Sequence, residues 1–224
     1  MDANRLEQFA LTKKLYDPMS PVHEFIIPTR SRKEVEKYLK ENKLMKNVRF
    51  VSYVTESGFN PSKAFNLGVR SAKYDHIIIT SPEVRPDTEV LSQLSNYLGE
   101  NVVCQVFDEN DKGEVGELLV NSTYRSQTPA FYFLAMYNKK DIEAINGWDE
   151  DFMRGYAYED DDFGARWVRA GLPFRFCDEI RGVHQYHPRS ETVPSGGQIN
   201  QAHLFENNSR GVIKCANGLE KLSL

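Results

Sequence analysis

The sequence predicts a single α/β domain in which helices flank a mixed, mostly parallel central sheet. The first half of the chain alternates short apolar runs with amphipathic segments, a pattern typical of strands joined by crossover helices. The second half changes character, with two strand-like runs on either side of the turn sequence Asn110-Asp111-Lys112-Gly113. A length of 224 residues allows one sizeable core and hardly two.

Each element follows from a local pattern. An N-terminal helix is expected within residues 1–20, because apolar side chains recur there before Asp17-Pro18 and Ser20-Pro21 close it. Apolar runs predict strands at 24–27, 49–54, 76–80, 102–107, 117–120, 131–137 and 174–177. Helices are expected at 33–42, 61–73, 87–99 and from Glu159 onward.

These elements divide the chain into three parts. Residues 1–22 form an N-terminal helical extension, residues 23–190 form the main domain, and residues 191–224 form a tail or flap that packs on the same domain. The tail is rich in Asn, Gln, Gly and Ser, and we see no internal repeat and no low-complexity linker.

Bulk composition excludes several classes of protein. The 28 Lys and Arg against 32 Asp and Glu give a net charge of −4, which does not indicate a nucleic-acid partner. No apolar run approaches the roughly 20 residues that cross a bilayer, and the polar start MDANRLEQ is unlike a signal peptide. Cys104, Cys177 and Cys215 lack metal or redox spacing, so they indicate reduced thiols in a cytoplasmic protein.

Residues 146–171, NGWDEDFMRGYAYEDDDFGARWVRAG, carry the most chemical information. A loop rich in glycine and aromatic residues leads into four carboxylates at 159–162, where a helix dipole favours negative charge. Phe163 and Trp167 lie one helical turn apart, and Gly171 and Pro173 end the helix. An ionised acid held there can take a proton, and the flat aromatic rings beside it suit stacking on a sugar. Together they indicate an enzyme that takes a proton from a hydroxyl.

This segment resembles the signature of inverting GT-A glycosyltransferases, in particular the galactosyltransferase-like and chondroitin-synthase-like branch of family 2. The matching residues are Asn146-Gly147-Trp148-Asp149-Glu150, Gly155-Tyr156-Ala157-Tyr158 and Glu159-Asp160, with Ala157 in place of the usual second glycine. The resemblance covers about residues 23–190 and implies a GT-A, Rossmann-like fold. It also implies a nucleotide-sugar donor, with a UDP-sugar favoured, and an acceptor hydroxyl.

By resemblance, Asp160 is the general base, and Glu159 binds the acceptor or orients the loop. Asp161 and Asp162 are expected to be solvated or paired with Arg166, since successive helix residues point in different directions. The sugar or acceptor pocket is assigned to Gly147, Trp148, Tyr156 and Tyr158. Alternatively, one of the three aromatic residues belongs to the core.

Polar residues follow the predicted strands at Thr29-Arg30, Thr55-Glu56 and Ser81-Pro82-Glu83, where ligands bind in open α/β sheets. Arg30 can stack on a base or pair with phosphate, although a polar cap on the strand explains it equally. The donor or nucleotide site is assigned to Thr29, Arg30, Glu56, Lys63, Asn66 and Ser81. For Asn66 and Lys63, the alternatives are a satisfied packing residue and a solvated charge.

The same resemblance places a metal-binding Asp-x-Asp pair where this chain has Ser81-Pro82-Glu83. Glu83 is then one metal ligand and His184 another, with His187 in reserve. Imidazole favours Mn²⁺ over Mg²⁺ as the divalent cation. Alternatively, Arg30 and Lys63 neutralise the diphosphate in place of a metal.

The predicted function is inverting transfer of a hexose from a nucleotide-sugar to an acceptor hydroxyl. One alternative is a nucleotidyltransferase, but Pro28–Arg32 lacks the glycine-rich loop expected of one. Another is a non-catalytic nucleotide-sugar or carbohydrate-binding relative, which the altered Asp-x-Asp supports. The acceptor stays open between a glycan, a protein, a lipid carrier and a nucleic-acid base, the last unsupported by the net charge.

Overall fold

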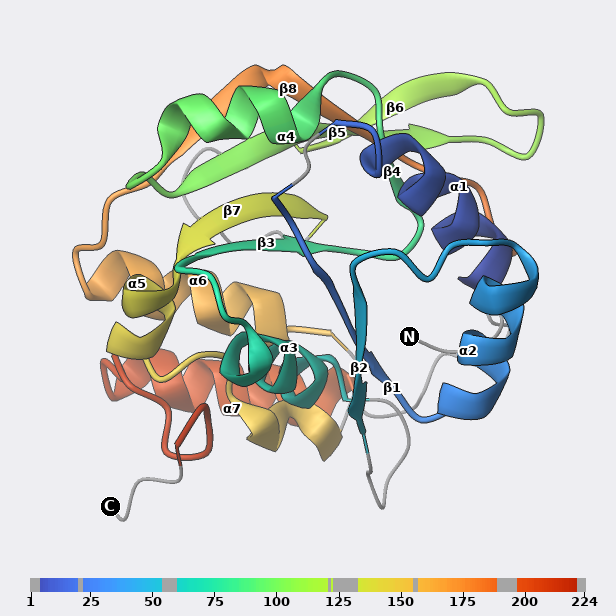
Figure 1. The fold of residues 1–224 in the computed structure, drawn as a ribbon. Coiled ribbons are helices and arrows are strands. Elements are labelled where there is room, and N and C mark those ends of the chain that lie inside the picture. The colour runs from blue at the N-terminus through green and yellow to red at the C-terminus, as the bar shows by residue number, and fades with distance from the viewer. Residues whose placement is uncertain are drawn as a thin grey trace.

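Helices cover a central sheet in the structure, which is a computed structural model describing residues 5–19, 22–53, 60–120, 122, 133–154, 157–188 and 197–220 (Figure 1). The helices are α1 (Leu6–Tyr16), α2 (Arg32–Glu41), α3 (Pro61–Ser71), α4 (Val90–Leu94), η2 (Ser95–Tyr97), α5 (Lys139–Ala144), η3 (Glu150–Arg154), α6 (Glu159–Arg169) and α7 (Gly197–Ser209). The strands are β1 (Phe25–Thr29), β2 (Val48–Ser52), β3 (His76–Thr80), β4 (Val84–Pro86), β5 (Val102–Glu109), β6 (Val115–Val120), β7 (Leu134–Asn138) and β8 (Arg175–His184). The predicted α/β class is confirmed.

The strand pairing corrects one detail of the prediction. β1 and β2 form a parallel pair, and the other strands form a sheet in the order β3-β7-β5-β8-β4, with β6 on β5. In that sheet β5 and β8 pair in parallel, whereas the β3/β7, β5/β7, β4/β8 and β5/β6 pairs are antiparallel. The larger sheet is therefore mixed rather than mostly parallel. A short turn with Gly113 at φ +77° obliges β5 and β6 to pair antiparallel.

The topology brings the carboxyl ends of three strands to one edge of the larger sheet. β3 and β5 are both antiparallel to β7, and β5 is parallel to β8, so all three run in the same direction. Asp108 on β5 pairs in register with His184, the last residue of β8. Val84 at the start of β4 pairs with the same His184. Residues next to these strand ends therefore converge.

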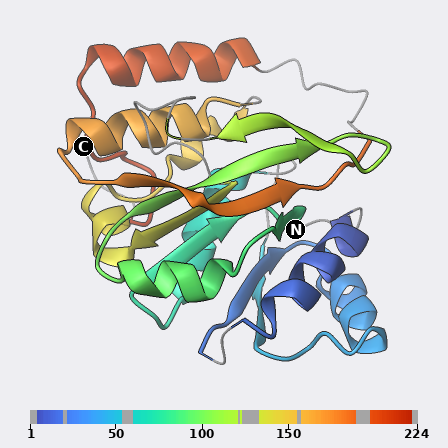
Figure 2. The same cartoon turned by 90° about the horizontal axis from the view of Figure 1, so that it is seen from above.

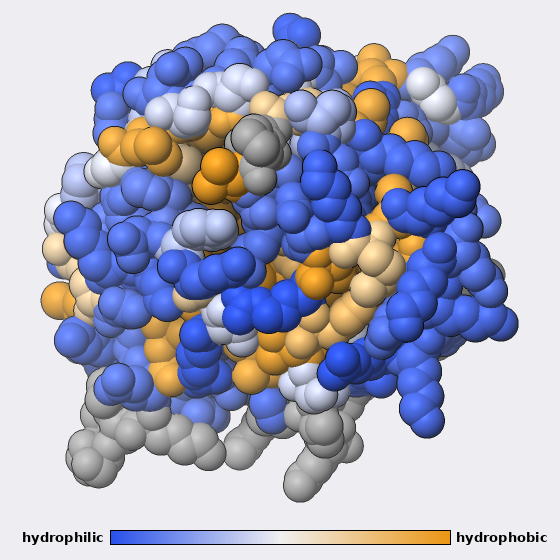
Figure 3. Space-filling model, in the orientation of Figure 1, coloured by the Kyte–Doolittle hydropathy of each residue, from blue (hydrophilic) through white to orange (hydrophobic). Residues whose placement is uncertain are grey.

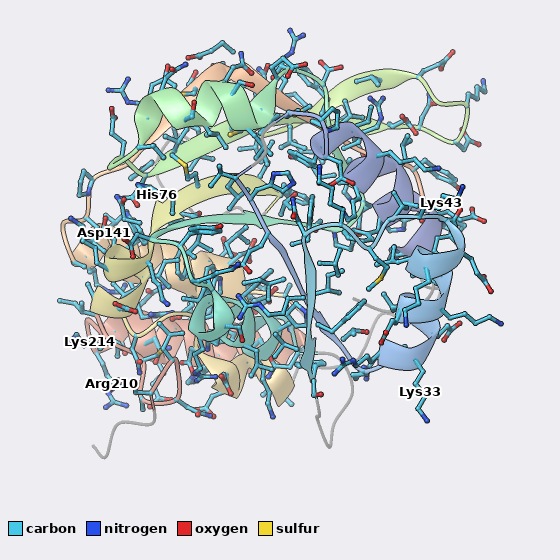
Figure 4. The ribbon with its side chains drawn as sticks, viewed as in Figure 1. Lys33, Lys43, His76, Asp141, Arg210 and Lys214 are labelled. Carbon is cyan, nitrogen blue, oxygen red and sulfur yellow. The ribbon has the colours of Figure 1, made fainter. Side chains whose placement is uncertain are left out.

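The opposite edge has a different role. His76 begins β3 and Asp141 belongs to α5, and both lie on the left-hand side of the molecule in Figure 4. There Nε2 of His76 accepts a hydrogen bond from the Gly99 amide at 3.0 Å, and Asp141 accepts one from Asn101 at 2.8 Å. These contacts are structural and join turns to the sheet.

Two apolar clusters hold the layers together. The larger one fills both faces of the β3–β8 sheet and includes Trp148, Phe163 and Trp167. The smaller one, with Phe9, Val35 and Leu39 fully or almost fully buried, joins α1 and α2 to β1. Figure 2 shows α7 as an outer layer beside α6. The face seen in Figure 3 is mostly hydrophilic, with an apolar band across its middle.

The largest differences from the expected elements lie after residue 86. The strand expected at 174–177 extends to His184, because its second part pairs with both β5 and β4. The helix expected at 87–99 is shorter, as α4 and η2. Helix α7 occupies part of the expected tail, and its buried residues are Asn200, Leu204 and Asn207. Because two of these are polar, hydrophobic periodicity could not reveal the helix.

Candidate functional site

Glu83, His184 and His187, here called the Glu83 cluster, meet at the edge where β3, β5 and β8 end. One ligand atom from each residue lies within 4.8 Å of the others. Oε1 of Glu83 is 3.8 Å from Nε2 of His184 and 3.5 Å from Nε2 of His187. The structure thus brings together the residue predicted from the third strand and both histidines predicted from the sequence after α6.

Asp108 orients one of these histidines. Its Oδ1 lies 2.9 Å from Nδ1 of His184, so we assign the Nδ1 proton to a hydrogen bond with Asp108. Nε2 of His184 then faces Glu83, as in metal sites where a carboxylate holds the ligating histidine. Burial alone would lower the pKa of His184, but its interactions with Glu83 and Asp108 raise it.

The Glu83 cluster fits a divalent cation by its hydrogen bonding as well as its composition. Oε2 of Glu83 is buried, and no described residue donates a hydrogen bond to it. Burial alone would raise the pKa of Glu83, but interactions with His184 and the nearby Arg5 guanidinium lower it, so the carboxylate is ionised at neutral pH. Oε1 is the oxygen that faces the imidazole nitrogens, so a cation there would also satisfy Oε2 if both carboxylate oxygens bound it.

Asp160 lies in the first turn of α6, which is the last element before β8. In Figure 1 the other end of α6 leads into the start of β8, so the acidic end of the helix faces the edge where β8 ends. Asp160 is partly accessible, and no ion pair joins it to a cation among the described residues. Burial, followed by the charges of Glu159 and Asp161, raises the pKa of Asp160 to about 7.

The other acids of this turn have different surroundings. Glu159 is buried and Asp161 is exposed. Asp162 has no exposed surface and makes an ion pair with Arg166 at 2.6 Å, so the predicted pairing is confirmed and the solvated alternative for Asp162 is wrong. Arg166 also donates to the carbonyl of Ile145 at 2.8 Å, which ties α6 to the end of α5.

The backbone before α6 is held in an unusual conformation. Ala157 and Tyr158 have φ values of +66° and +75°, in the left-handed region. That region costs an L-residue roughly 1–2 kcal/mol, so Ala157 keeps a conformation that the usual glycine would adopt without strain. Tyr158 remains partly accessible at the amino end of α6.

Two residues predicted for the sugar pocket belong to the core instead. Trp148 is 1% exposed and stacks on Phe163 with ring centroids 4.1 Å apart, so its face is not open to a sugar. Gly147 has φ +70°, and a side chain there would collide with Asn66 and Leu219. Packing at this position therefore requires glycine. Both assignments are therefore corrected.

Asn66 is also corrected from donor contact to structural support. It is fully buried, and its Oδ1 accepts from the Trp148 amide at 3.0 Å while its Nδ2 donates to the Trp148 carbonyl at 2.8 Å. Nδ2 is also 3.1 Å from Oε1 of Glu150. These bonds use its amide group to brace the loop after Asn146.

The remaining predicted donor residues lie at strand ends or at a helix start. Thr29 ends β1, is buried, and accepts from the Ser31 amide at 3.1 Å. Arg30 follows it and is exposed, and Lys63 is partly exposed in the first turn of α3. Ser81 lies between β3 and β4, close in sequence to Glu83. Glu56 and Tyr156 lie outside the described residues.

A second polar network joins α7 to the loop before α6. Asp149, His203 and Asn207, here called the Asp149 clamp, connect through Oδ2 of Asp149, which is 2.9 Å from Nε2 of His203 and 3.3 Å from Nδ2 of Asn207. Asn207 also donates to Asp162 at 2.9 Å. Sequence reasoning missed the clamp because Asp149 lies 54 positions before His203, and no motif links it to the two α7 residues.

Sequence reasoning also missed Asp108 and Arg5. Asp108 directly follows the predicted strand 102–107, so the rule on strand ends could have found it. Arg5, whose Nε lies 3.5 Å from Oε1 of Glu83, has no local signal. A cavity of about 410 Å³ along the β5–β6 hairpin includes Asp108 but none of the residues predicted to bind donor or acceptor.

Comparisons with known proteins concern one region of the sequence and the fold. Residues 122–188 match a family model described as the N-terminal domain of galactosyltransferase. The structure of S. aureus TarS 1–349 in complex with UDP is similar to the chain, with a TM-score of 0.63, 13% identity, and coverage of 97% of this chain and 64% of that one. The chain has the GT-A glycosyltransferase fold.

Another GT-A structure supports the same conclusion. The mannosyltransferase PcManGT from Pyrobaculum calidifontis, in complex with GDP-Man and Mn²⁺, has a TM-score of 0.54, 14% identity, and coverage of 89% of this chain and 60% of that one. The chain thus spans less than two thirds of the length of these structures, and 39% of a longer TarS structure. No curated protein sequence gives a significant match. No helix among the described residues is long and apolar enough to span a bilayer.

The family match thus concerns residues 122–188, the structural matches concern the fold, and the Glu83 cluster has side chains that could hold a metal ion. Of the matched structures, one TarS structure is a complex with UDP and the mannosyltransferase structure is a complex with GDP-Man and Mn²⁺.

Proposed function

We propose that this protein is an inverting hexosyltransferase that uses Asp160 as its general base. The observation that carries the proposal is the environment of Asp160, whose carboxyl group is partly accessible and has a pKa of about 7. A base with a pKa near the working pH combines a useful ionised fraction with a useful proton affinity. Asp162, two residues later, is neutralised by Arg166 and is unsuited to this role.

The proposed donor is a UDP-hexose bound along the strand ends, with Thr29, Arg30, Lys63 and Ser81 as contacts. Glu83, His184 and His187 would hold a divalent cation, for which the imidazole ligands favour Mn²⁺. Such a cation would stabilise the negative charge on the leaving diphosphate. The matched mannosyltransferase, whose structure contains Mn²⁺ and GDP-Man, supports this choice and keeps GDP-sugars as an alternative donor class.

In the proposed reaction, the acceptor oxygen attacks the anomeric carbon from the face opposite the diphosphate. A new C–O bond forms, the bond from the sugar to the diphosphate breaks, and the diphosphate leaves with the electron pair. Asp160 takes the hydroxyl proton, and Glu159 and Tyr158 lie beside it in sequence to orient the acceptor. The configuration at the anomeric carbon is inverted because the attack is a single displacement.

The deciding experiment compares Asp160→Asn with Asp161→Asn. Both remove one negative charge from the same turn, but Asp161 is exposed. Release of nucleoside diphosphate would be followed with a panel of UDP- and GDP-sugars and Mn²⁺. We expect Asp160→Asn to lower turnover about 1,000-fold, in the range of a lost general base, with UDP binding nearly unchanged. Normal turnover by Asp160→Asn would overturn the assignment.

The same assay separates the alternatives. A nucleotidyltransferase would release pyrophosphate rather than nucleoside diphosphate. A non-catalytic relative, which Ser81 in place of an acidic residue favours, would bind a nucleotide-sugar without turnover by either protein. In wild type, kcat/KM should fall as pH drops below about 7, because protonation of Asp160 removes the base.

A further inference from the structure

The N-terminal helix α1 lies beside the Glu83 cluster. Arg5 precedes the first turn of α1, and its Nε lies 3.5 Å from Oε1 of Glu83, the oxygen that also faces both histidines. Figure 1 shows α1 beside β4, the strand that begins directly after Glu83. The sequence predicts this helix as an N-terminal extension, and none of the predicted site residues lies in it.

Gln185 fixes α1 to the cluster. This buried side chain lies between His184 and His187, and its Nε2 is 3.0 Å from Oγ1 of Thr12 and 2.8 Å from the carbonyl of Glu83. Nε2 is also 3.1 Å from the carbonyl of Gln8, whose own amide reaches the carbonyl of Tyr186 at 3.5 Å. These hydrogen bonds therefore hold the segment that carries the histidines against the helix that follows Arg5.

The charges around the cluster require a further anion. Among the described residues, Glu83 contributes the only carboxylate that faces the two imidazole Nε2 atoms, since Asp108 is engaged with Nδ1 of His184. A divalent cation there and the Arg5 guanidinium would together carry three positive charges, against the two negative charges of Glu83 and Asp108, which leaves an excess of positive charge. A diphosphate carries enough negative charge to balance it, and a guanidinium fork matches phosphate oxygens in geometry.

We propose that Arg5 is a donor-binding residue whose guanidinium pairs with the diphosphate of the nucleotide-sugar. This inference rests on the proposed function. In the absence of donor, Arg5 stays on Glu83, and it moves to the diphosphate when a cation takes over the carboxylate. Arg5 has 22% of its side chain exposed, which leaves it room to change partner.

Arg5→Gln should change the affinities for UDP and for Mn²⁺ differently. UDP affinity in saturating Mn²⁺ should fall about 10-fold, as for loss of a charge-assisted pair. Mn²⁺ affinity without nucleotide should be unchanged or higher, because a competing cation has been removed from Glu83. A purely structural role for Arg5 would instead weaken both binding events or neither.

The experiment measures Mn²⁺ binding by electron paramagnetic resonance and UDP and GDP binding by calorimetry, for wild type, Arg5→Gln, Arg5→Lys and Lys14→Gln. Lys14 is an exposed cation on the same helix and serves as the charge control. Arg5→Lys should retain part of the nucleotide affinity, and it covers the case in which Arg5→Gln does not fold.

The outcomes separate the two proposals. Wild-type UDP affinity in Arg5→Gln would overturn the role of Arg5 and leave the proposed function intact. Equal weakening of Mn²⁺ and UDP binding would also overturn it, because Arg5 would then only position Glu83. Failure of wild type to bind UDP or GDP in Mn²⁺ would overturn the proposed function and this inference together.

Discussion

Two regions of the molecule have nearly the same residue types but differ in whether their carboxylate oxygens accept hydrogen bonds. In the Glu83 cluster, one carboxylate faces two histidines. Around the Asp149 clamp, ligand atoms of Asp149, Asp151 and His203 also lie within 4.8 Å of one another. By composition and spacing, either group could hold a metal ion.

The difference lies in which oxygens are already satisfied. Oδ1 of Asp149 accepts from the Asp151 amide at 3.0 Å, and Oδ2 accepts from His203 and Asn207. Oε2 of Glu83 has no donor among the described residues. In both regions the pKa of the carboxyl group is lowered and that of a histidine is raised, so charge alone does not distinguish them.

Saturation of hydrogen bonds therefore separates a structural clamp from a ligand site. A carboxylate whose lone pairs are filled by fixed donors stabilises the fold, because a cation would have to displace those donors. A buried carboxylate oxygen without a donor costs stability until a ligand binds. This pattern is typical of functional sites.

The largest expected effect comes from matched charge removal in the two regions. Glu83→Gln should weaken Mn²⁺ binding at least about 100-fold, because the cluster loses its only carboxylate facing the histidines. Asp149→Asn should leave Mn²⁺ binding unchanged but lower the free energy of unfolding by about 2–3 kcal/mol, because its single side-chain oxygen cannot accept both from the Asp151 amide and from His203 and Asn207, and its NH₂ group then faces a donor. Paramagnetic resonance and urea unfolding in EDTA measure the two quantities.

Each variant is the control for the other, since each replaces a carboxylate with its amide. If Asp149→Asn weakened Mn²⁺ binding more than Glu83→Gln, the two regions would have been assigned the wrong way round. If Glu83→Gln lost as much unfolding free energy as Asp149→Asn, the distinction by hydrogen bonding would not hold.

A smaller effect should follow from removal of the residue that orients His184. Asp108→Ala should lower Mn²⁺ affinity about 10- to 100-fold, as for other carboxylates that hold a ligating histidine. Asp108→Asn should lose less, because its side-chain oxygen can still accept from Nδ1. Glu109→Ala is the control, since the neighbouring Glu109 pairs with Arg85 instead. Equal losses in the alanine variants would argue against an orienting role.

The smallest effect is the pH dependence of the clamp. The hydrogen bond to Asp149 raises the pKa of His203, so this contribution is present below the ordinary value of 6.5 and is lost as pH rises through the raised value. The lowered pKa of Asp149 contributes above its ordinary value of 3.8 and is lost as pH falls through the lowered value. The clamp is therefore strongest between about pH 4 and 6.5.

Unfolding in urea at pH 5.5 and pH 8.5 would test this for His203→Gln. We expect a loss of about 1 kcal/mol at the lower pH and a clearly smaller loss at the higher pH. The same loss at both pH values would mean that the protonated imidazole adds nothing to the clamp.

Much of this protein could be predicted from local sequence. Helix α6 begins at Glu159 and ends before Gly171 at φ +66°, because acidic residues, apolar spacing and a glycine stop all act within a few residues. The Asp162–Arg166 pair lies one helical turn apart, so it too is a local property. Glu83 and the two histidines lie together as the prediction requires, and their role as metal ligands stays a prediction.

Tertiary structure alone decided which side chains face the site and which are buried in the core. Trp148 and Asn66 have the residue types of a sugar and donor site, yet both are buried, because Trp148 packs on α3 and α6 and Asn66 of α3 bonds to the Trp148 backbone. Asp108 reaches His184 across 76 positions of sequence, and α1 brings Arg5 back to Glu83. Periodicity and spacing act over one or two turns of chain, whereas burial and the pairing of distant charges depend on how whole elements pack. For that reason the sequence determined the chemistry available to this protein, and the packing of α1, β5 and α7 decided where that chemistry can act.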